Sequence, residues 1–100
     1  MNMVTISGYS FEGPYEIGKR VIDRAAIYVI LDSNKDLIDV GQSGETGTRL
    51  SSHERKPCWD RNGGKWFGVR WMPSDRYSRE DRERIEREIR ANEDPPCGEI

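Results

Sequence analysis

The longest apolar stretch of the chain covers residues 25–31, and it limits what the chain can fold into. It is far shorter than the roughly 20 apolar residues needed to cross a bilayer, and its length suits a buried strand. Because residues 26–31 are apolar at every position, both faces of this strand need cover from other elements. We therefore predict a sheet covered on both sides, in a protein without a membrane-spanning segment.

A second strand follows after a short turn. Residues 32–36 are rich in turn formers and residues 37–42 are again β-forming, which predicts an antiparallel hairpin. If Ser33-Asn34 forms a two-residue loop, Tyr28 lies directly across from Asp39. Cross-strand partners share a face of the sheet, so we expect these two side chains to be neighbours on one face.

Three further elements complete the predicted secondary structure. Residues 48–56 predict a short helix that ends at Pro57, and residues 65–71 predict a third strand. A longer helix is expected from its capping residue, Ser78, to about Asn92. Strands and helices are therefore mixed along the chain, as in an α/β domain.

The length of the chain sets the number of domains. Its 100 residues are enough for one domain of ordinary size and too few for two. Residues 1–24 alternate turn formers with β-formers and predict an N-terminal extension of short extended pieces. Residues 25–100 predict a single small α/β domain, with a mainly antiparallel three-stranded sheet flanked by helices.

Charge is distributed unevenly along the chain. The formal net charge of −2 argues against a protein that holds nucleic acid by overall charge alone. Residues 45–71, however, carry six basic and three acidic side chains. Within this segment Lys56, Arg61 and Lys65 are our candidates for contact with a phosphate backbone. The alternative is an ordinary solvated surface.

The two cysteines bear on the cellular compartment. Cys58 and Cys97 lie far apart and form no C-x-x-C pair, which predicts reduced thiols in a cytoplasmic protein. A disulfide between them is the less favoured alternative. The first nine residues lack the pattern of a secretory signal, which also favours an intracellular protein.

Four short motifs occur in a fixed order within residues 26–98. The motifs are Ala26-Ile27-Tyr28 on the first predicted strand, Asp39-Val40-Gly41 on the second, Arg49 with His53 four residues later, and Glu86 with Pro95 nine residues later. In order and spacing they resemble the motifs of the GIY-YIG nuclease superfamily. The resemblance implies a GIY-YIG endonuclease-like fold and metal-dependent hydrolysis of DNA. Two residues depart from the family pattern: Asp39 stands in place of a tyrosine, and Gly98 in place of an asparagine.

The chemistry of phosphodiester hydrolysis assigns roles to two of these residues. The reaction needs an activated water and cations that balance charge in the transition state. Arg49 is a candidate for a bidentate contact with phosphate, unless it is only a surface arginine. Glu86 borders the apolar stripe of its helix and is a candidate ligand for one Mg²⁺ or Mn²⁺ ion, with a solvated helix charge as the alternative.

Tyr28, His53 and Asp39 are the remaining catalytic candidates. The hydroxyl of Tyr28 could orient water or phosphate, although an aromatic residue in an apolar strand also suits the core. His53 is the one histidine of the chain and could relay a proton near neutral pH. Asp39 could replace the family tyrosine as a base or join Glu86 at the metal.

We therefore expect a metal-dependent endonuclease that hydrolyses phosphodiester bonds of DNA. The alternative is a catalytically impaired module of the same fold that binds nucleic acid or another protein, which the two departures favour. Because little of the chain lies outside the domain, specificity would have to come from a structured substrate, a second copy of the chain or a targeting subunit.

Overall fold

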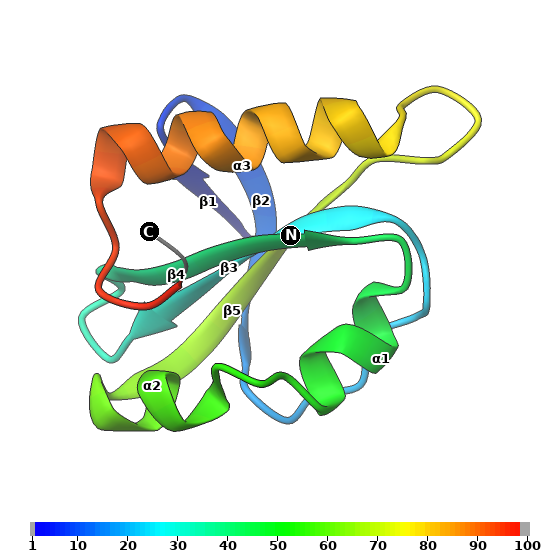
Figure 1. Cartoon of the computed structure of the whole chain (residues 1–100). Helices are drawn as coiled ribbons and strands as arrows, with labels where there is room; N and C mark the ends of the chain where they lie inside the picture. Colours follow the sequence, from blue (N-terminus) through cyan, green and yellow to red (C-terminus); the bar gives the residue numbers. More distant parts are fainter. Residues whose placement is uncertain (1, 99–100) are drawn as a thin grey trace.

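The computed structural model describes residues 2–98. This part of the chain forms five strands and three helices (Figure 1). Their bounds are β1 (Met3–Ile6), β2 (Tyr9–Glu16), β3 (Ala26–Asp32), β4 (Leu37–Ser43), α1 (Thr46–Ser51), α2 (Lys56–Arg61), β5 (Gly64–Trp71) and α3 (Arg79–Glu93). Among the described residues, no helix has the length and apolar character that a membrane crossing requires.

All five strands belong to one antiparallel sheet with the order β1-β2-β5-β3-β4. The predicted hairpin and third strand are β3, β4 and β5, so the mainly antiparallel α/β domain is confirmed. The prediction of only three strands is wrong, because β1 and β2 extend the sheet along β5. Strand β2 was not predicted because Gly and Pro, as in Gly13-Pro14, normally interrupt a strand. In the structure this pair lies at an irregularity between Glu12 and Tyr15, where the pairing with β5 shifts.

Both faces of the sheet are covered, as the sequence predicts (Figure 1). Side chains of β3 alternate between the two. Ile27, Val29 and Leu31 pack beneath α3, on what we call the α3 face, together with Ile85 and Ile89 of that helix. The opposite side, which α1 and α2 cover, is the α2 face. Its buried apolar cluster is Ala26, Tyr28, Ile30, Ile38, Trp59, Phe67, Val69 and Cys97.

The register of the β3–β4 hairpin differs from the predicted one. Tyr28 pairs with Gly41, and not with Asp39. The turn is longer than two residues, because the Asp32 carboxylate accepts two backbone N–H groups of the turn and Lys35 adopts a left-handed φ of 67°. The error amounts to two residues, which returns each side chain to its predicted face. Tyr28 and Asp39 therefore still share the α2 face.

The predicted helix over residues 48–56 is wrong as a single element. The structure has two short helices there, α1 and α2, joined by an irregular segment. The hydroxyls of Ser51 and Ser52 both bond back to the carbonyl of Thr48, which competes with continued helical pairing. Pro57 does not end a helix but lies in the first turn of α2, where its missing N–H costs nothing.

Helix α3 agrees with its prediction. Ser78 caps it in a reciprocal capping box with Asp81, and Ile85 and Ile89 form its buried stripe. The helix ends at Glu93, and its C-cap residue, Asp94, adopts a left-handed conformation. The chain then turns back towards the sheet, so the end of α3 determines the position of the C-terminal tail.

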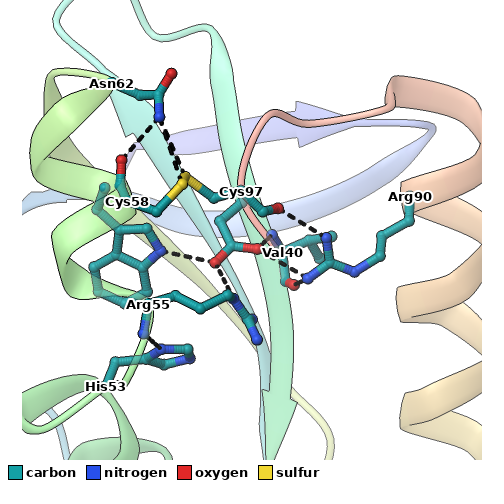
Figure 2. The surroundings of a disulfide bond; sticks show 9 residues. Val40, His53, Arg55, Cys58, Asn62, Arg90 and Cys97 are labelled. Carbon is teal, nitrogen blue, oxygen red and sulfur yellow. Dashed lines mark hydrogen bonds and ion pairs between the residues drawn. A yellow bond between two sulfur atoms is a disulfide. The ribbon is translucent and has the colours of Figure 1, made fainter. Parts of the chain in front are cut away.

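The C-terminal tail is tied to the edge of the sheet and to α2. The N–H of Cys97 donates to the carbonyl of Ile38 on β4, at 2.9 Å. Cys97 also forms a disulfide with Cys58, with their Cα atoms 5.9 Å apart (Figure 2). The prediction of reduced thiols is therefore wrong, because α3 brings together residues 39 positions apart. The prediction of a cytoplasmic protein loses the support that it drew from free thiols.

Candidate active site

Tyr28 is held in place by the glycine opposite it on β4. A Cβ atom at Gly41 would lie 2.3 Å from the Tyr28 hydroxyl oxygen and 2.4 Å from the adjacent ring carbon. The phenol therefore lies across the bare backbone of Gly41, and any side chain there would displace it. This close approach gives the Tyr-and-Gly pairing of the two strands a physical cause. It places a buried hydroxyl at the β4 side of the α2 face.

His53 contacts that hydroxyl through Nε2, at 2.5 Å. Its other ring nitrogen, Nδ1, accepts the backbone N–H of Arg55 at 3.0 Å. A neutral imidazole carries one proton, so we assign it to Nε2, which donates to the Tyr28 oxygen. Burial, with the nearby charges of Arg49 and Arg55, lowers the pKa of His53 to about 4, so the ring is neutral at pH 7.

The proton of the Tyr28 hydroxyl is consequently free for a third group, because its oxygen already accepts the bond from His53. Burial raises the pKa of Tyr28 to about 12, while Arg55 and Arg49 act in the opposite direction. The hydroxyl is therefore protonated at neutral pH and can donate to an anion or a water molecule. This geometry does not favour His53 as a proton relay, because Tyr28 and the backbone N–H of Arg55 already engage its two ring nitrogens.

Arg49 reaches the same place from α1. Its Nη1 donates to an oxygen of Glu54 at 2.5 Å, and the Tyr28 hydroxyl also helps to raise the pKa of Arg49. The same bond lowers the pKa of Glu54 to about 2. Arg49 and His53 thus both lie next to Tyr28, although His53 follows the end of α1 and does not share one helix with Arg49. Glu54 is exposed and occupies the guanidinium that a phosphate would use.

Asp39 has a different place from the one predicted. Its side chain is fully buried, and its two oxygens accept four hydrogen bonds at 2.7–2.9 Å, from the Val40 N–H, Arg55 Nε, Trp59 Nε1 and Arg90 Nη2. Arg55 and Arg90 come from opposite sides of β4 (Figure 2). With both oxygens engaged, Asp39 has no free position for a substrate proton or a metal ion. We therefore assign Asp39 to the structure and not to catalysis.

Sequence reasoning missed Arg55 and Arg90, the two cations that flank Asp39. Arg55 seemed one of several basic residues of a solvated segment, and Arg90 one of five arginines on a charged helix. A usable signal was Asp39 itself, since a carboxylate on a buried strand needs cationic or N–H partners. Arg90 also donates to the carbonyls of Val40 and Cys97, so it joins β4 to the tail.

Glu86 lies where α3 passes the same edge of the sheet and is half-buried. Burial raises its pKa, against the opposing charge of Arg90 and, more weakly, of Arg55. Arg90 Nε reaches one Glu86 oxygen at 3.3 Å, a long contact for a charged hydrogen bond. The carboxylate is thus desolvated and only loosely paired, which suits a site for a cation.

The Glu86 carboxylate fits a hard cation, such as Mg²⁺, that keeps most of its bound water molecules. Within residues 2–98, no three His, Cys, Asp or Glu side chains gather as ligands, so a closed protein cage is absent there. Mg²⁺ commonly binds through one or two carboxylates, with water and substrate phosphate filling the other positions. A single Glu86 carboxylate is therefore sufficient for such an ion when a phosphate is bound.

The three predicted nucleic-acid contacts are not grouped around Tyr28. Lys56 begins α2, and Arg61 ends it; both are exposed. Lys65 is exposed on β5 beside Trp66, which pairs with Leu31, three residues along β3 from Tyr28. Their role in binding stays a prediction. The chemistry of the site instead comes from Tyr28, Arg49, His53, Arg55 and Glu86.

These five side chains combine two neutral hydrogen-bond donors, two cations and one carboxylate. They come from β3, α1, the segment before α2, and α3, so the whole fold positions them. Comparisons of the chain with protein families, with curated proteins and with solved structures gave no match. The function is therefore argued from this arrangement.

Proposed function

We propose that the protein is a metal-dependent endonuclease that hydrolyses phosphodiester bonds of DNA, of the GIY-YIG type. One observation carries the proposal. Of the motif residues, Tyr28 lies against Gly41 and its hydroxyl contacts His53, while the charges of Arg49 and Glu86 act on the same hydroxyl. A surface of unrelated function has no reason to collect a phenol, an imidazole, arginines and a carboxylate from four separate elements.

In this proposal Arg49 and Arg55 hold the scissile phosphate. Arginine presents a planar fork of donors that matches two phosphate oxygens. Glu54 holds Arg49 while no substrate is bound, and the incoming phosphate takes over that contact. Arg55 is oriented by Asp39, so the buried carboxylate contributes by fixing a cation and not by accepting a proton.

Tyr28 orients the attacking water in this proposal. His53 donates to the phenol oxygen, which directs the phenol proton outward towards water or a phosphate oxygen. Because its pKa is raised to about 12, the phenol keeps its proton at pH 7 and positions the water as a hydrogen-bond donor, without accepting a proton from it. Glu86 is the residue that would hold the ion. A bound Mg²⁺ or Mn²⁺ would supply positive charge at the phosphate and the departing oxygen.

The test is incubation of the full chain with supercoiled plasmid and with branched DNA, in Mg²⁺, in Mn²⁺ and in EDTA. We expect metal-dependent nicking that Glu86→Gln abolishes, because the amide loses the charge that attracts the ion. Glu80→Gln, on the exposed first turn of the same helix, is the matched control and keeps activity. Cleavage in EDTA, or full activity of Glu86→Gln, contradicts the proposal.

A second candidate is a module of the same fold that binds DNA without cutting it. Asp39 and Gly98 favour it, because each stands where the family has a functional residue. At position 98 the structure has no room for a side chain, because Gly98 has a φ of +114° and a Cβ there would lie 2.1 Å from Arg90 Nη1. This candidate predicts DNA binding by fluorescence anisotropy, with no cleavage in either metal. Cleavage lost in Glu86→Gln rules it out.

A further inference from the structure

A groove of about 500 Å³ lies on the α2 face, next to the candidate active site. One wall is the loop between β2 and β3, which passes beside α1 (Figure 1). Helices α1 and α2 supply the rest of the rim, and the floor is apolar, with Ile30, Trp59 and Phe67. A volume of this size is in the ordinary range for small-ligand sites.

The loop is fastened to α1 and therefore forms a fixed wall. Both oxygens of Asp23 accept hydrogen bonds at 2.6 Å from Thr48, one from its backbone N–H and one from its hydroxyl. A Cβ at Gly47 would lie 2.1 Å from the Val21 carbonyl oxygen, so helix and loop touch through backbone atoms. Asp23 is the one carboxylate among the lining residues, and it is already engaged.

The rim of the groove is positively charged. Lys19, Arg20 and Lys56 line it and are exposed, and none of them forms an ion pair with another residue of the described chain. Two residues with hydroxyl groups, Thr48 and Ser51, line the wall that α1 forms. Three cations above an apolar floor suit a ligand with an anionic group and a flat, weakly polar body. A nucleotide has this combination.

The groove and the candidate site share one short segment of chain. Trp59 forms part of the groove floor, and the centroid of its ring lies 4.6 Å from the centroid of the His53 ring. On α1, Thr48, Leu50 and Ser51 line the groove. Arg49, which lies between Thr48 and Leu50, does not line it, and its charge acts on Tyr28 instead. A strand whose phosphate met Arg49 would therefore have its neighbouring nucleotide at the groove.

We propose that this groove binds the nucleotide next to the scissile phosphate. Lys19, Arg20 and Lys56 take its phosphate, and the apolar floor with the α1 hydroxyls takes its sugar and base. The position beside the scissile bond rests on the proposed endonuclease function. The proposal gives the N-terminal region, for which the sequence suggested no role, a part in substrate binding.

The experiment measures binding of a short fluorescein-labelled single-stranded DNA to the full chain, in EDTA, by fluorescence anisotropy. Lys19→Ala with Arg20→Ala should weaken binding about tenfold and lower the slope of log affinity against log salt by about 1.4. The matched control, Arg84→Ala with Arg87→Ala, removes the same charge from exposed positions on α3 and should change affinity by no more than about twofold. An equal loss of DNA affinity in the two double variants would overturn the proposal that the groove binds a nucleotide.

A second variant separates occupation of the groove from charge. Ser51→Trp adds a bulky side chain at the α1 wall without changing the net charge, and it should also weaken binding about tenfold. Unchanged binding by a folded Ser51→Trp protein overturns the proposal. The two proposals fail separately. Groove-dependent binding without cleavage in any metal refutes the endonuclease and keeps the groove as a nucleotide site, whereas metal-dependent cleavage with unchanged DNA binding in both groove variants refutes the groove and keeps the endonuclease.

Discussion

The two faces of the sheet are built on different principles, although strand β3 contributes to both. On the α3 face the buried cluster is apolar throughout, and Ile85 and Ile89 close it from above. The α2 face buries Asp39 and His53 among its aromatic and aliphatic residues. Burying a polar group is costly unless its atoms have partners, so Asp39 and His53 on the α2 face depend on the hydrogen bonds that engage their oxygens and nitrogens. The α3 face depends mainly on shape and apolar area, and its buried charge, Arg82, bonds to Gln42 of β4 at 2.9 Å.

This difference indicates where function can reside. An apolar cluster offers nothing to a phosphate, whereas a polar network at the edge of a core holds its side chains in fixed orientations. Asp39 illustrates the principle, because it is inaccessible to substrate yet orients Arg55 from one side and Arg90 from the other. The following predictions separate the two faces, starting with the largest expected effect.

Asp39→Ala should have the largest effect on stability. It leaves Arg55, Arg90 and the Trp59 indole without their shared acceptor, and breaking a buried charged pair in this way costs about 3–5 kcal/mol in the free energy of unfolding. Urea unfolding followed by circular dichroism measures it. A loss below about 1 kcal/mol would mean that the network does not support the α2 face.

Removal of the disulfide should have a nearly equal effect. Cys58→Ser with Cys97→Ser opens a loop of 39 residues, and the chain-entropy estimate for such a loop is about 4 kcal/mol. Thermal unfolding of the double variant should match that of the wild type in excess dithiol. If dithiol leaves the unfolding temperature of the wild type unchanged, the bond does not hold the tail on α2.

The pH dependence of stability should report the buried His53. Its pKa is about 4 in the folded protein and near 6.5 in a free histidine, so the unfolded chain binds more protons between these values. The contribution is complete above pH 6.5 and is lost as the pH falls towards 4, by roughly 3 kcal/mol. His53→Gln should lack this part of the slope. As the chain has one histidine, its NMR titration is unambiguous, and a midpoint near 6.5 would contradict the burial.

Arg49→Ala should lower the cleavage rate about 10²-fold, equivalent to about 2.7 kcal/mol of transition-state stabilisation. Its side chain is about one-third exposed, so its loss should leave the fold intact. Arg84→Ala, an exposed arginine on α3, is the control and should cut at the wild-type rate. Equal rates for both variants would remove Arg49 from the proposed site.

Much of the fold was predictable because local patterns decide it. The doubly apolar β3 and the capped helix α3 are specified by residues close together in sequence. The face shared by Tyr28 and Asp39 was predicted despite a wrong register, since an error of two residues preserves the pleat. Strand β2 was missed because only tertiary pairing with β5 accommodates Gly13-Pro14.

The candidate site was predictable only in part. The motifs identified Tyr28, and the structure brings His53 to its hydroxyl, on which the charge of Arg49 also acts. The tautomer of His53 depends on one backbone N–H from Arg55, which no sequence pattern reveals. The disulfide follows from the path of the chain after α3, and the engagement of Asp39 follows from the packing of Arg55, Trp59 and Arg90 against β4; both are long-range features. Such features set what each motif residue can do, while the motifs indicate only which residues to consider.

The smallest expected change in stability gives the sharpest comparison of the two faces, because it removes a single heavy atom from each. Ile89→Val deletes one methyl group from the α3 face and should cost about 1 kcal/mol without altering cleavage. Tyr28→Phe deletes one oxygen from the α2 face and leaves the His53 Nε2–H without its acceptor, again at about 1–2 kcal/mol. Only Tyr28→Phe should lower the rate, by about 10²-fold or more, since it alone removes the group that orients water in the proposed mechanism. Urea unfolding and plasmid nicking on both variants make the comparison, and equal rates would mean that the polar network serves stability alone.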